Sequence, residues 1–378
     1  MKTPFYEPHS RASPLPARQI PVILPAVSHY LRPAIPALLA SFIIASAACA
    51  APPYPLSDHY DGKRFFNPET VQKHTFWTFL RWQFTRERAP WPASLPPAPK
   101  PDLRPVAPGE VQITWIGHST CLIRFHGWTV IADPVFSERA SPVSWAGPRR
   151  VWPPALAADE LPPVDTVIVS HNHYEHLDLP SLRELHALYG PEFIVPLANK
   201  TLLAGEGITR VTELDWWQQM ENPGGSSGAT KRVTLTPARH WSARGLFDRY
   251  EMLWGSFMLE HDGIRVYFAG DTGYGRHFSE IRDRLGAPDV SLIPIGTYEP
   301  RWFMRDHHTN PDDAVRAHLD LGSRLSMGIH FGTFQLSDEA IDEPPRALAA
   351  ALAERSLSPA EFIAPEPGQT IVWKRYGE

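Results

Sequence analysis

A short segment rich in potential metal ligands lies near the middle of the 378-residue chain. The sequence SHNHYEHLD, residues 170–178, holds three histidines and two acidic residues between His171 and Asp178. It directly follows the apolar run VDTVIV, residues 164–169, which predicts a buried strand. The chain has only two cysteines, too few for a disulfide framework or a cysteine-ligated zinc site. A metal would therefore be held by His, Asp and Glu.

Three more residues of the same kinds follow other predicted strands, namely His240, Asp271 and His330. Neutral imidazole and carboxylate are natural ligands of a zinc-like divalent ion, and a site with vacant positions can activate water. A single histidine at a strand end is more often structural. The spacing His-x-His-x-x-His after an apolar strand, together with three later residues of the same kind, predicts a metal site.

The elements that position these residues follow an alternating pattern beyond Gly109, which predicts an α/β domain. Strands are predicted over 111–117, 121–125, 128–133, 164–171, 232–240, 256–261, 264–271, 290–296 and 326–332. Helices are predicted over 179–189, 277–285, 311–321 and 345–355. Several strands end on a polar, metal-capable residue followed by a loop, which is where rigid scaffolds place catalytic groups.

Longer motifs carry a family resemblance. SHNHYEHLD is similar to the His-x-His-x-Asp-His motif of the metallo-β-lactamase superfamily, and AGDTGY and GIHFGTF resemble its later metal-binding motifs. In chain order, TWIGHSTCLI, ADPVFSERASPVSWAGPRR, LPPVDTVIVSHNHYEHLD, ELDWW, LWGSF, FAGDTGY, IPIGTYEPRWFM and IHFGTFQLSDE resemble the N-acylphosphatidylethanolamine-hydrolysing phospholipase D branch. The similarity spans roughly residues 110–365.

The resemblance implies a four-layered αβ/βα sandwich with two zinc ions at one edge of the sheets. It implies that His171, His173 and His240 hold the first zinc, and that Asp271 bridges. Glu175, His176 and His330 would complete the second site. Two cations sharing a water lower its pKa towards neutrality. The implied reaction is attack by metal-bound hydroxide on a phosphodiester, giving phosphatidic acid and the head-group alcohol.

Glu175 departs from the family pattern, which has Asp at this position. The added methylene moves the carboxylate by about 1.5 Å, whereas zinc-ligand distances vary by only a few tenths of an ångström. Three alternatives stay open for the second site: Glu175 binds through a shifted backbone or rotamer, the second metal binds less tightly, or the centre is mononuclear. In a fourth alternative Glu175 does not bind the metal, and its carboxylate is either solvated or contacts a metal ligand instead.

Other residues are expected around the ligands. Asp178 is expected to orient a ligand histidine, or alternatively to cap a helix. The resemblance places His118 and Asp133 near the metals, with a structural role as the alternative for each. It places His308 near the substrate, where it is a candidate catalytic residue with Asp271 and Glu175. The motif TYEPRWFM is a candidate substrate loop, in which an arginine meets phosphate and apolar side chains meet an acyl chain, unless those side chains are core: Tyr298, Arg301, Trp302, Phe303 and Met304.

The N-terminal part divides into two segments ahead of the catalytic domain of residues 110–378. Residues 1–50 combine basic residues with the apolar stretch AIPALLASFIIASAACA, which predicts an export signal or a membrane anchor. The chain is thus expected to be exported, periplasmic or membrane-anchored, with the cytoplasmic membrane surface as the alternative. Residues 51–109 contain an aromatic helix over 71–84, followed by a proline-rich linker.

Composition limits the partners. A formal net charge of -5 gives no overall positive field, so nucleic acid is not expected as a partner. The expected partners are a phospholipid substrate, a membrane surface bound peripherally and, as an open possibility, a second copy in a homodimer. Two alternatives keep the fold: a hydrolase of carbonyl substrates such as lactones, thioesters or β-lactams, and a degenerate protein that binds lipid without hydrolysing it.

Overall fold

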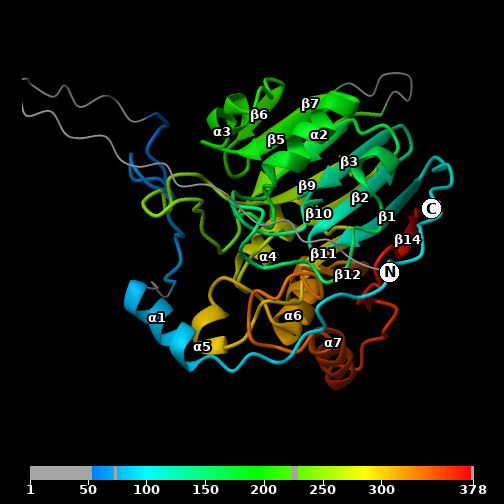
Figure 1. The fold of residues 1–378 in the computed structure, drawn as a ribbon. Helices are drawn as coiled ribbons and strands as arrows, with labels where there is room; N and C mark the ends of the chain where they lie inside the picture. Colours follow the sequence, from blue (N-terminus) through cyan, green and yellow to red (C-terminus); the bar gives the residue numbers. More distant parts are fainter. Residues whose placement is uncertain (1–52, 72–74, 223–228, 376–378) are drawn as a thin grey trace, which may run out of the picture. The chain divides into compact units, whose positions relative to one another are not determined.

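The computed structural model describes residues 53–71, 75–222 and 229–375 of the chain (Figure 1). They belong to one unit of the chain, which begins at Pro52. The predicted export signal or anchor of residues 1–50 lies outside the described residues.

The first of two seven-stranded sheets has the strand order β14-β1-β2-β3-β4-β5-β6. Strands β14, β1, β2 and β3 pair antiparallel, whereas β3, β4, β5 and β6 pair parallel. The strand bounds are β1 (Glu110–Gly117), β2 (Thr120–Phe125), β3 (Trp128–Ala132), β4 (Thr166–Ile168), β5 (Glu192–Pro196), β6 (Val211–Leu214) and β14 (Thr370–Lys374). Helices α2 (Leu179–Tyr189) and α3 (Lys200–Gly205) connect its parallel strands, as parallel pairing requires.

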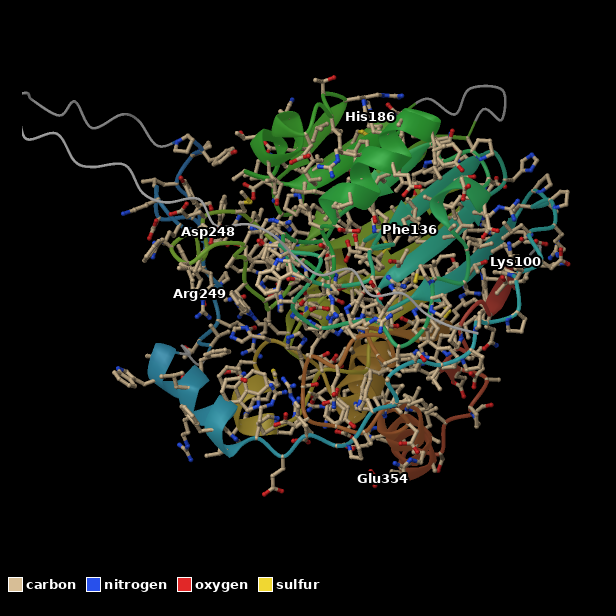
Figure 2. All side chains as sticks on the ribbon, viewed as in Figure 1. Lys100, Phe136, His186, Asp248, Arg249 and Glu354 are labelled. Carbon is tan, nitrogen blue, oxygen red and sulfur yellow. The ribbon has the colours of Figure 1, made fainter. Side chains whose placement is uncertain are left out.

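The second sheet has the order β13-β12-β11-β10-β9-β8-β7, with β10 to β13 parallel. Its strands are β7 (Gln219–Asn222), β8 (Lys231–Thr236), β9 (Ser256–His261), β10 (Ile264–Phe268), β11 (Val290–Pro294), β12 (Leu325–Ile329) and β13 (Phe362–Ile363). Helices α4 (His277–Leu285), α6 (Pro311–Leu321) and α7 (Glu343–Glu354) pack together beside this sheet. In Figure 2, His186 of α2 and Glu354 of α7 lie on opposite sides of the two sheets. The predicted αβ/βα sandwich is thereby confirmed.

Strand side chains alternate between two cores, which explains the layering. On β2, Cys121 and Ile123 face the core between the sheets, whereas Leu122 faces α2 and α3. On β4, Ile168 joins the central core and Val167 the outer one. A strand that is buried on both faces has a continuous apolar sequence rather than alternating apolar and polar residues. The apolar runs of this chain follow that rule. Burial of both faces fixes the register, because a slip of one residue would exchange the two cores.

The segment ahead of β1 packs on the same unit. Tyr60 and Phe65 join the central core. Helix α1 (Phe76–Thr85) begins where Thr75 accepts a hydrogen bond from Thr78 N, within the predicted range 71–84. The proline-rich stretch that follows is bonded to the domain, since Ala89 N donates to Asp338 O. None of the helices within the described ranges is both long and apolar enough to cross a membrane.

The loops that carry the predicted ligands leave the sheets at neighbouring strand ends. Residues 170–176 follow β4 and Asp271 follows β10, while His330 directly follows β12. The first two loops touch at Gly270, which has φ +57. A Cβ at Gly270 would lie 2.5 Å from Ser170 Cβ, so only glycine lets the two loops approach this closely.

This contact predicts that substitution of Gly270 destabilises the protein more than substitution of other glycines with a positive φ. Gly270→Ala combines backbone strain with a clash, and we expect the free energy of unfolding to fall by about 2–4 kcal/mol. Gly190→Ala is the matched control, because Gly190 has φ +56 but open space around its Cβ position. The control is expected to lose only about 1 kcal/mol. Urea unfolding of the metal-free proteins measures both, and equal losses would contradict the close approach of the two loops.

Candidate metal centre

Three histidines from two loops form the first cluster. The ligand nitrogens of His171, His173 and His240 all lie within 4.8 Å of one another. His173 Nδ1 is 2.9 Å from His171 Nε2 and 3.2 Å from His240 Nε2. His240 Nδ1 lies 3.0 Å from the carbonyl oxygen of His307, which orients the ring and leaves Nε2 towards the cluster. The three imidazoles expected to hold the first zinc are thus brought together.

The second cluster surrounds Asp271. Ligand atoms of Glu175, His176, Asp271 and His330 also lie within 4.8 Å of one another. Asp271 Oδ2 is 3.2 Å from His176 Nε2 and 3.1 Å from His330 Nε2. The same oxygen is 3.8 Å from His240 Nε2, a member of the first cluster. The carboxylate therefore lies between the clusters, in the place expected of a bridging ligand.

The polar atoms of these clusters fit a cation better than they fit one another. Both Asp271 carboxylate oxygens, His173 Nε2, His176 Nε2 and both His330 nitrogens are buried without a hydrogen-bond partner. An unpaired buried polar group costs about 1–3 kcal/mol, and buried polar atoms are normally paired. A donor set of imidazoles and carboxylate suits zinc and related divalent ions. Cations bound here would satisfy these atoms together.

Protonation supports the same assignment. Burial lowers the pKa of His171, His173 and His240 well below the usual histidine value, so their rings are neutral and offer a lone pair. Burial would raise the pKa of Asp271, but His176 and His330 outweigh it and hold that pKa well below the usual range. His176 differs: burial would lower its pKa, but Asp271 and Asp133 outweigh burial and raise that pKa well above the usual histidine value. Neutral imidazole and ionised carboxylate are the forms that bind a cation, so His176 would lose its proton when a cation binds.

Asp133 orients the ligand-bearing loop. Its Oδ2 lies 2.6 Å from His176 Nδ1 and accepts a hydrogen bond from Ser170 Oγ. Ser170 Oγ in turn lies 2.9 Å from His171 Nδ1. Carboxylate partners of this kind fix the ring and tautomer of a metal-binding histidine. The expected position of Asp133 beside the ligands agrees with this geometry.

Asp178 does not have the expected role. Its carboxylate accepts hydrogen bonds from Ser137 N and Ser181 Oγ and contacts no ligand histidine. It is the residue that precedes helix α2, but its side chain makes no capping hydrogen bond to that helix's backbone. The expectation that Asp178 orients a ligand is wrong because its side chain turns towards residue 137. Asp133 contacts His176 instead.

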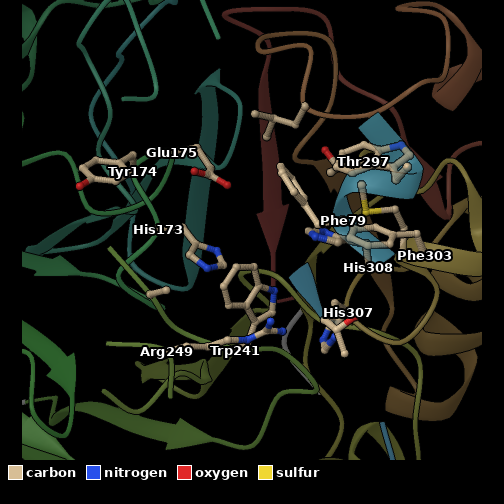
Figure 3. A pocket seen from close by; sticks show the side chains of 15 residues that line it. Phe79, His173, Tyr174, Glu175, Trp241, Arg249, Thr297, Phe303, His307 and His308 are labelled. Carbon is tan, nitrogen blue, oxygen red and sulfur yellow. The ribbon is translucent and has the colours of Figure 1, made fainter. Parts of the chain in front are cut away.

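Glu175 reaches the second cluster despite its extra methylene. Its side chain is half-buried, and a carboxylate oxygen comes within 4.8 Å of the ligand atoms of His176, Asp271 and His330. In Figure 3 the Glu175 carboxylate lies at the cavity, above His173. Glu175 is therefore the member of the second cluster nearest to the opening.

A cavity of about 510 Å³ opens beside the two clusters (Figure 3). One wall comes from α1 and α5 (Arg301–Met304), and another from residues 241–249 between β8 and β9. Most of the lining is apolar or aromatic, and Arg249 brings a cationic side chain to it. The lining residues are Thr75, Phe79, Trp82, His173, Tyr174, Glu175, Trp241, Ala243, Arg249, Thr297, Phe303, Met304, His307, His308 and Leu336.

The predicted substrate residues divide into two groups. Phe303, Met304 and His308 line the cavity, and His308 Nδ1 lies 3.7 Å from Asp271 Oδ2. Burial lowers the pKa of His308 to about 3. The other three predicted residues, Tyr298, Arg301 and Trp302, are not part of the lining.

The side chains of that second group have other partners. Tyr298 Oη donates to Glu343, and the Arg301 guanidinium donates to Asp313 Oδ2 and to the carbonyl of His308. The expectation that Arg301 meets a phosphate is wrong for this geometry, because an acidic partner holds it within the fold.

Sequence reasoning missed Arg249 and Trp241. The Arg249 guanidinium lies over the Trp241 ring, 4.4 Å from its centroid, and both line the cavity. The only sequence signal was their position in the segment HWSARGLFDRY, residues 240–250, which begins with the predicted ligand His240.

Comparisons with known proteins agree with this architecture. The sequence model described as "Beta-lactamase superfamily domain" matches residues 129–331. "N-acyl-phosphatidylethanolamine-hydrolyzing phospholipase D 1" of Caenorhabditis elegans is 38% identical over 271 residues, which cover 69% of this chain and 75% of that protein. The mitochondrial N-acyl-phosphatidylethanolamine-hydrolyzing phospholipase D of Saccharomyces cerevisiae is 36% identical over 260 residues, covering 68% of this chain and 55% of that protein.

Solved structures show the same fold at lower identity. Isothiocyanate hydrolase from Delia radicum gut bacteria has a TM-score of 0.56 at 18% identity, covering 70% of this chain and 100% of that one. Igni18, a metallo hydrolase from Ignicoccus hospitalis, has a TM-score of 0.53 at 21% identity, covering 71% and 100%. The chain belongs to the metallo-β-lactamase superfamily of metal-dependent hydrolases, within its N-acylphosphatidylethanolamine-hydrolysing phospholipase D branch.

Proposed function

We propose that this protein is a zinc-dependent phosphodiesterase of phospholipase D type. Its substrate would be N-acylphosphatidylethanolamine or a related glycerophospholipid, and its products phosphatidic acid and the head-group alcohol. One observation carries the proposal: an apolar cavity of about 510 Å³ with an arginine in its wall is lined by one member of each cluster, His173 and Glu175. Relatives named for this reaction are 36% and 38% identical to the chain.

The two clusters would hold the cations. His171, His173 and His240 would hold one and His176, His330 and Glu175 the other, with Asp271 between them. Bound there, two cations would acidify a shared water and neutralise charge on phosphoryl oxygens. In the reaction a water oxygen forms a bond to phosphorus, the bond from phosphorus to the head-group oxygen breaks, and the alcohol leaves with a proton.

Arg249 and His308 are suited to bind the phosphodiester. A guanidinium donates up to five hydrogen bonds in a planar fork that matches phosphate oxygens. Arg249 lines the cavity together with His173, a member of the first cluster, so a phosphate bound there would meet both. His308 lies in the same wall, 3.7 Å from Asp271, and its imidazole can donate one hydrogen bond to a phosphoryl oxygen.

The apolar walls are suited to an acyl chain. Phe79 and Trp82 of α1 line the cavity together with Phe303 and Met304 of α5, and Trp82 stacks on Phe303 with ring centroids 4.8 Å apart. Beyond the cavity, Phe84 of α1 and Leu246 and Phe247 of the 241–249 loop are exposed by 84–91%. Exposed apolar side chains on the two segments that form the cavity walls favour peripheral contact with a membrane.

The expected location of the protein and its expected homodimer are also part of this proposal. Export to the periplasm or anchoring by residues 1–50 would bring the cavity to a membrane surface, and the cytoplasmic membrane surface is the alternative. A homodimer stays a prediction.

The first experiment compares substrates. We expect metal-dependent release of N-acylethanolamine from N-acylphosphatidylethanolamine in phospholipid vesicles, lost on treatment with EDTA and restored by zinc. A lactone, a thioester and a cephalosporin serve as carbonyl comparisons and are expected to react far more slowly. Faster turnover of one of them would replace the proposal with a carbonyl hydrolase, and lipid binding without hydrolysis would replace it with a lipid-binding protein.

The second experiment removes the charge between the clusters. Asp271→Asn keeps the shape of the side chain, and we expect the loss of detectable turnover with an unchanged circular dichroism spectrum, because the anion between the clusters is gone. Asp283→Asn is the matched control, since Asp283 is an exposed aspartate of α4. Undiminished phosphodiesterase activity of Asp271→Asn would refute the bridging role.

The third experiment tests the phosphate contact. We expect Arg249→Gln to lower kcat/KM for the phosphodiester by about 10–100-fold, because a hydrogen bond to a charged group contributes about 1.5–3 kcal/mol. Arg305→Gln is the matched control, an exposed arginine outside the cavity lining. Equal kcat/KM values for the two variants would remove Arg249 from substrate binding.

A further inference from the structure

His118 lies in the turn between β1 and β2, held in an uncommon backbone conformation. Its φ is +54, in the left-handed region that non-glycine residues rarely occupy. Three hydrogen bonds hold its backbone: its N–H donates to Thr333 Oγ1, and its carbonyl accepts from Trp115 Nε1 and from the backbone N–H of His330. The backbone of His118 is therefore bonded directly to the loop that carries a proposed metal ligand.

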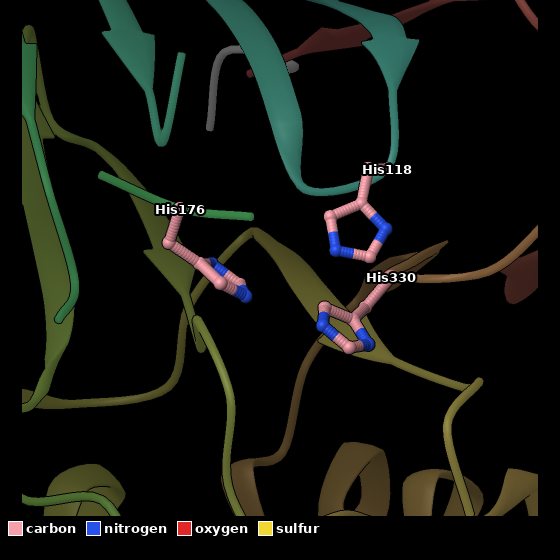
Figure 4. A group of neighbouring side chains, drawn as sticks. All are labelled: His118, His176 and His330. Carbon is pink, nitrogen blue, oxygen red and sulfur yellow. The ribbon is translucent and has the colours of Figure 1, made fainter. Parts of the chain in front are cut away.

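The ring of His118 is buried among two of those ligands. His118 is 1% exposed, and its ring centroid lies 4.1 Å from that of His330 and 5.6 Å from that of His176. A ligand nitrogen from each of the three rings lies within 4.8 Å of the other two. Figure 4 shows the three imidazoles around one space, with His118 and His330 arriving from different loops.

Both ring nitrogens of His118 are buried without a hydrogen-bond partner. A neutral imidazole has one donor and one acceptor, and leaving both unpaired in the interior is unfavourable. A packing role does not need an imidazole here, because an apolar ring beside Phe334 would avoid that penalty. Buried nitrogens aimed at the space shared with two neighbouring histidines are explained by a cation in that space.

We propose that His118 is a ligand of the second cation, together with His176 and His330. Glu175 lines the open cavity, whereas His118 does not and is fully enclosed. Three buried histidines would then bind the second cation beside Glu175 and Asp271, in a chain where Glu175 stands in place of the shorter aspartate of the family pattern. The inference rests on the metal centre of the proposed function, but metal binding tests it without any substrate.

The decisive variant is His118→Gly. Glycine adopts φ +54 without strain, so the turn keeps its conformation while the imidazole is lost. We expect zinc affinity at one of two sites, measured by chelator competition, to fall by about 100-fold or more, since loss of an outer hydrogen-bond partner alone costs 10–100-fold. Added imidazole should enter the space left by the ring and restore the second equivalent of zinc.

His118→Phe is the matched control, because it fills the space with a ring that has no ligand atom. It should lose the second zinc as well, but imidazole should not restore it. Wild-type affinity in His118→Gly would overturn the proposal. The same loss in both variants with no response to imidazole would also overturn it and reduce His118 to a positioning residue.

A measurement on the unaltered protein covers the case in which the variants fold poorly. Cobalt(II) shifts the resonances of bound imidazole N–H groups in proton NMR, so each ligand histidine can be counted. Five histidines are expected without His118, namely His171, His173, His176, His240 and His330, and six with it. Six shifted resonances would support the proposal, and five would refute it. Neither result bears on whether the substrate is a phospholipid.

Discussion

The structure depends on one buried carboxylate surrounded by imidazoles. Asp271 Oδ2 lies within 4.0 Å of ring nitrogens from five histidines: His171, His176, His240, His308 and His330. Neither of its oxygens makes a hydrogen bond. An ion pair buried in this way is stable only when its charges and hydrogen-bonding groups are satisfied. Divalent cations are the simplest occupants that satisfy the carboxylate and the imidazoles together.

The fold is arranged to make that cluster possible. Parallel strands place their carboxyl ends along one edge of each sheet, and the ligand loops leave the sheets there. Gly270 allows the loop after β10 to touch the loop after β4. Asp133 and Ser170 then hold His176 and His171 in fixed orientations. The cavity lies on the outer side of this rigid core, where α1 and the 241–249 loop complete its walls.

Secondary structure was predicted best from the sequence where the residues that determine an element lie within that element or next to it. The helices at 179–189, 277–285 and 311–321 match the structure, because their apolar spacing and flanking residues lie within one segment. Helix α7 begins at Glu343, earlier than the expected 345, since Pro344 and Pro345 fit in a first helical turn that does not use their missing N–H groups. Helix α3 and strands β5, β6, β7, β13 and β14 were not predicted. Of these, QMEN of β7 is polar and FI of β13 has only two residues, so neither gives a strand signal.

In the candidate site, too, residues with a local sequence signal were predicted and residues placed by distant contacts were not. The histidines of the two clusters and Asp271 could be predicted from strand ends and motif spacing. The cavity wall could not, because Arg249 and Trp241 reach it through a loop whose path depends on distant contacts. Arg301 seemed suitable by charge alone, but Asp313, twelve residues later, binds it. The partner of a side chain depends on the tertiary structure and cannot be deduced from the residue type alone.

Metal content is the most direct test of the central claim that these side chains hold divalent ions. The protein should be purified without chelators or metal-affinity resin and analysed for zinc and other transition metals by elemental analysis. Between one and two ions per chain are expected, with the value rising to two when zinc is supplied. Fewer than one ion per chain, unchanged by added zinc, would contradict the account.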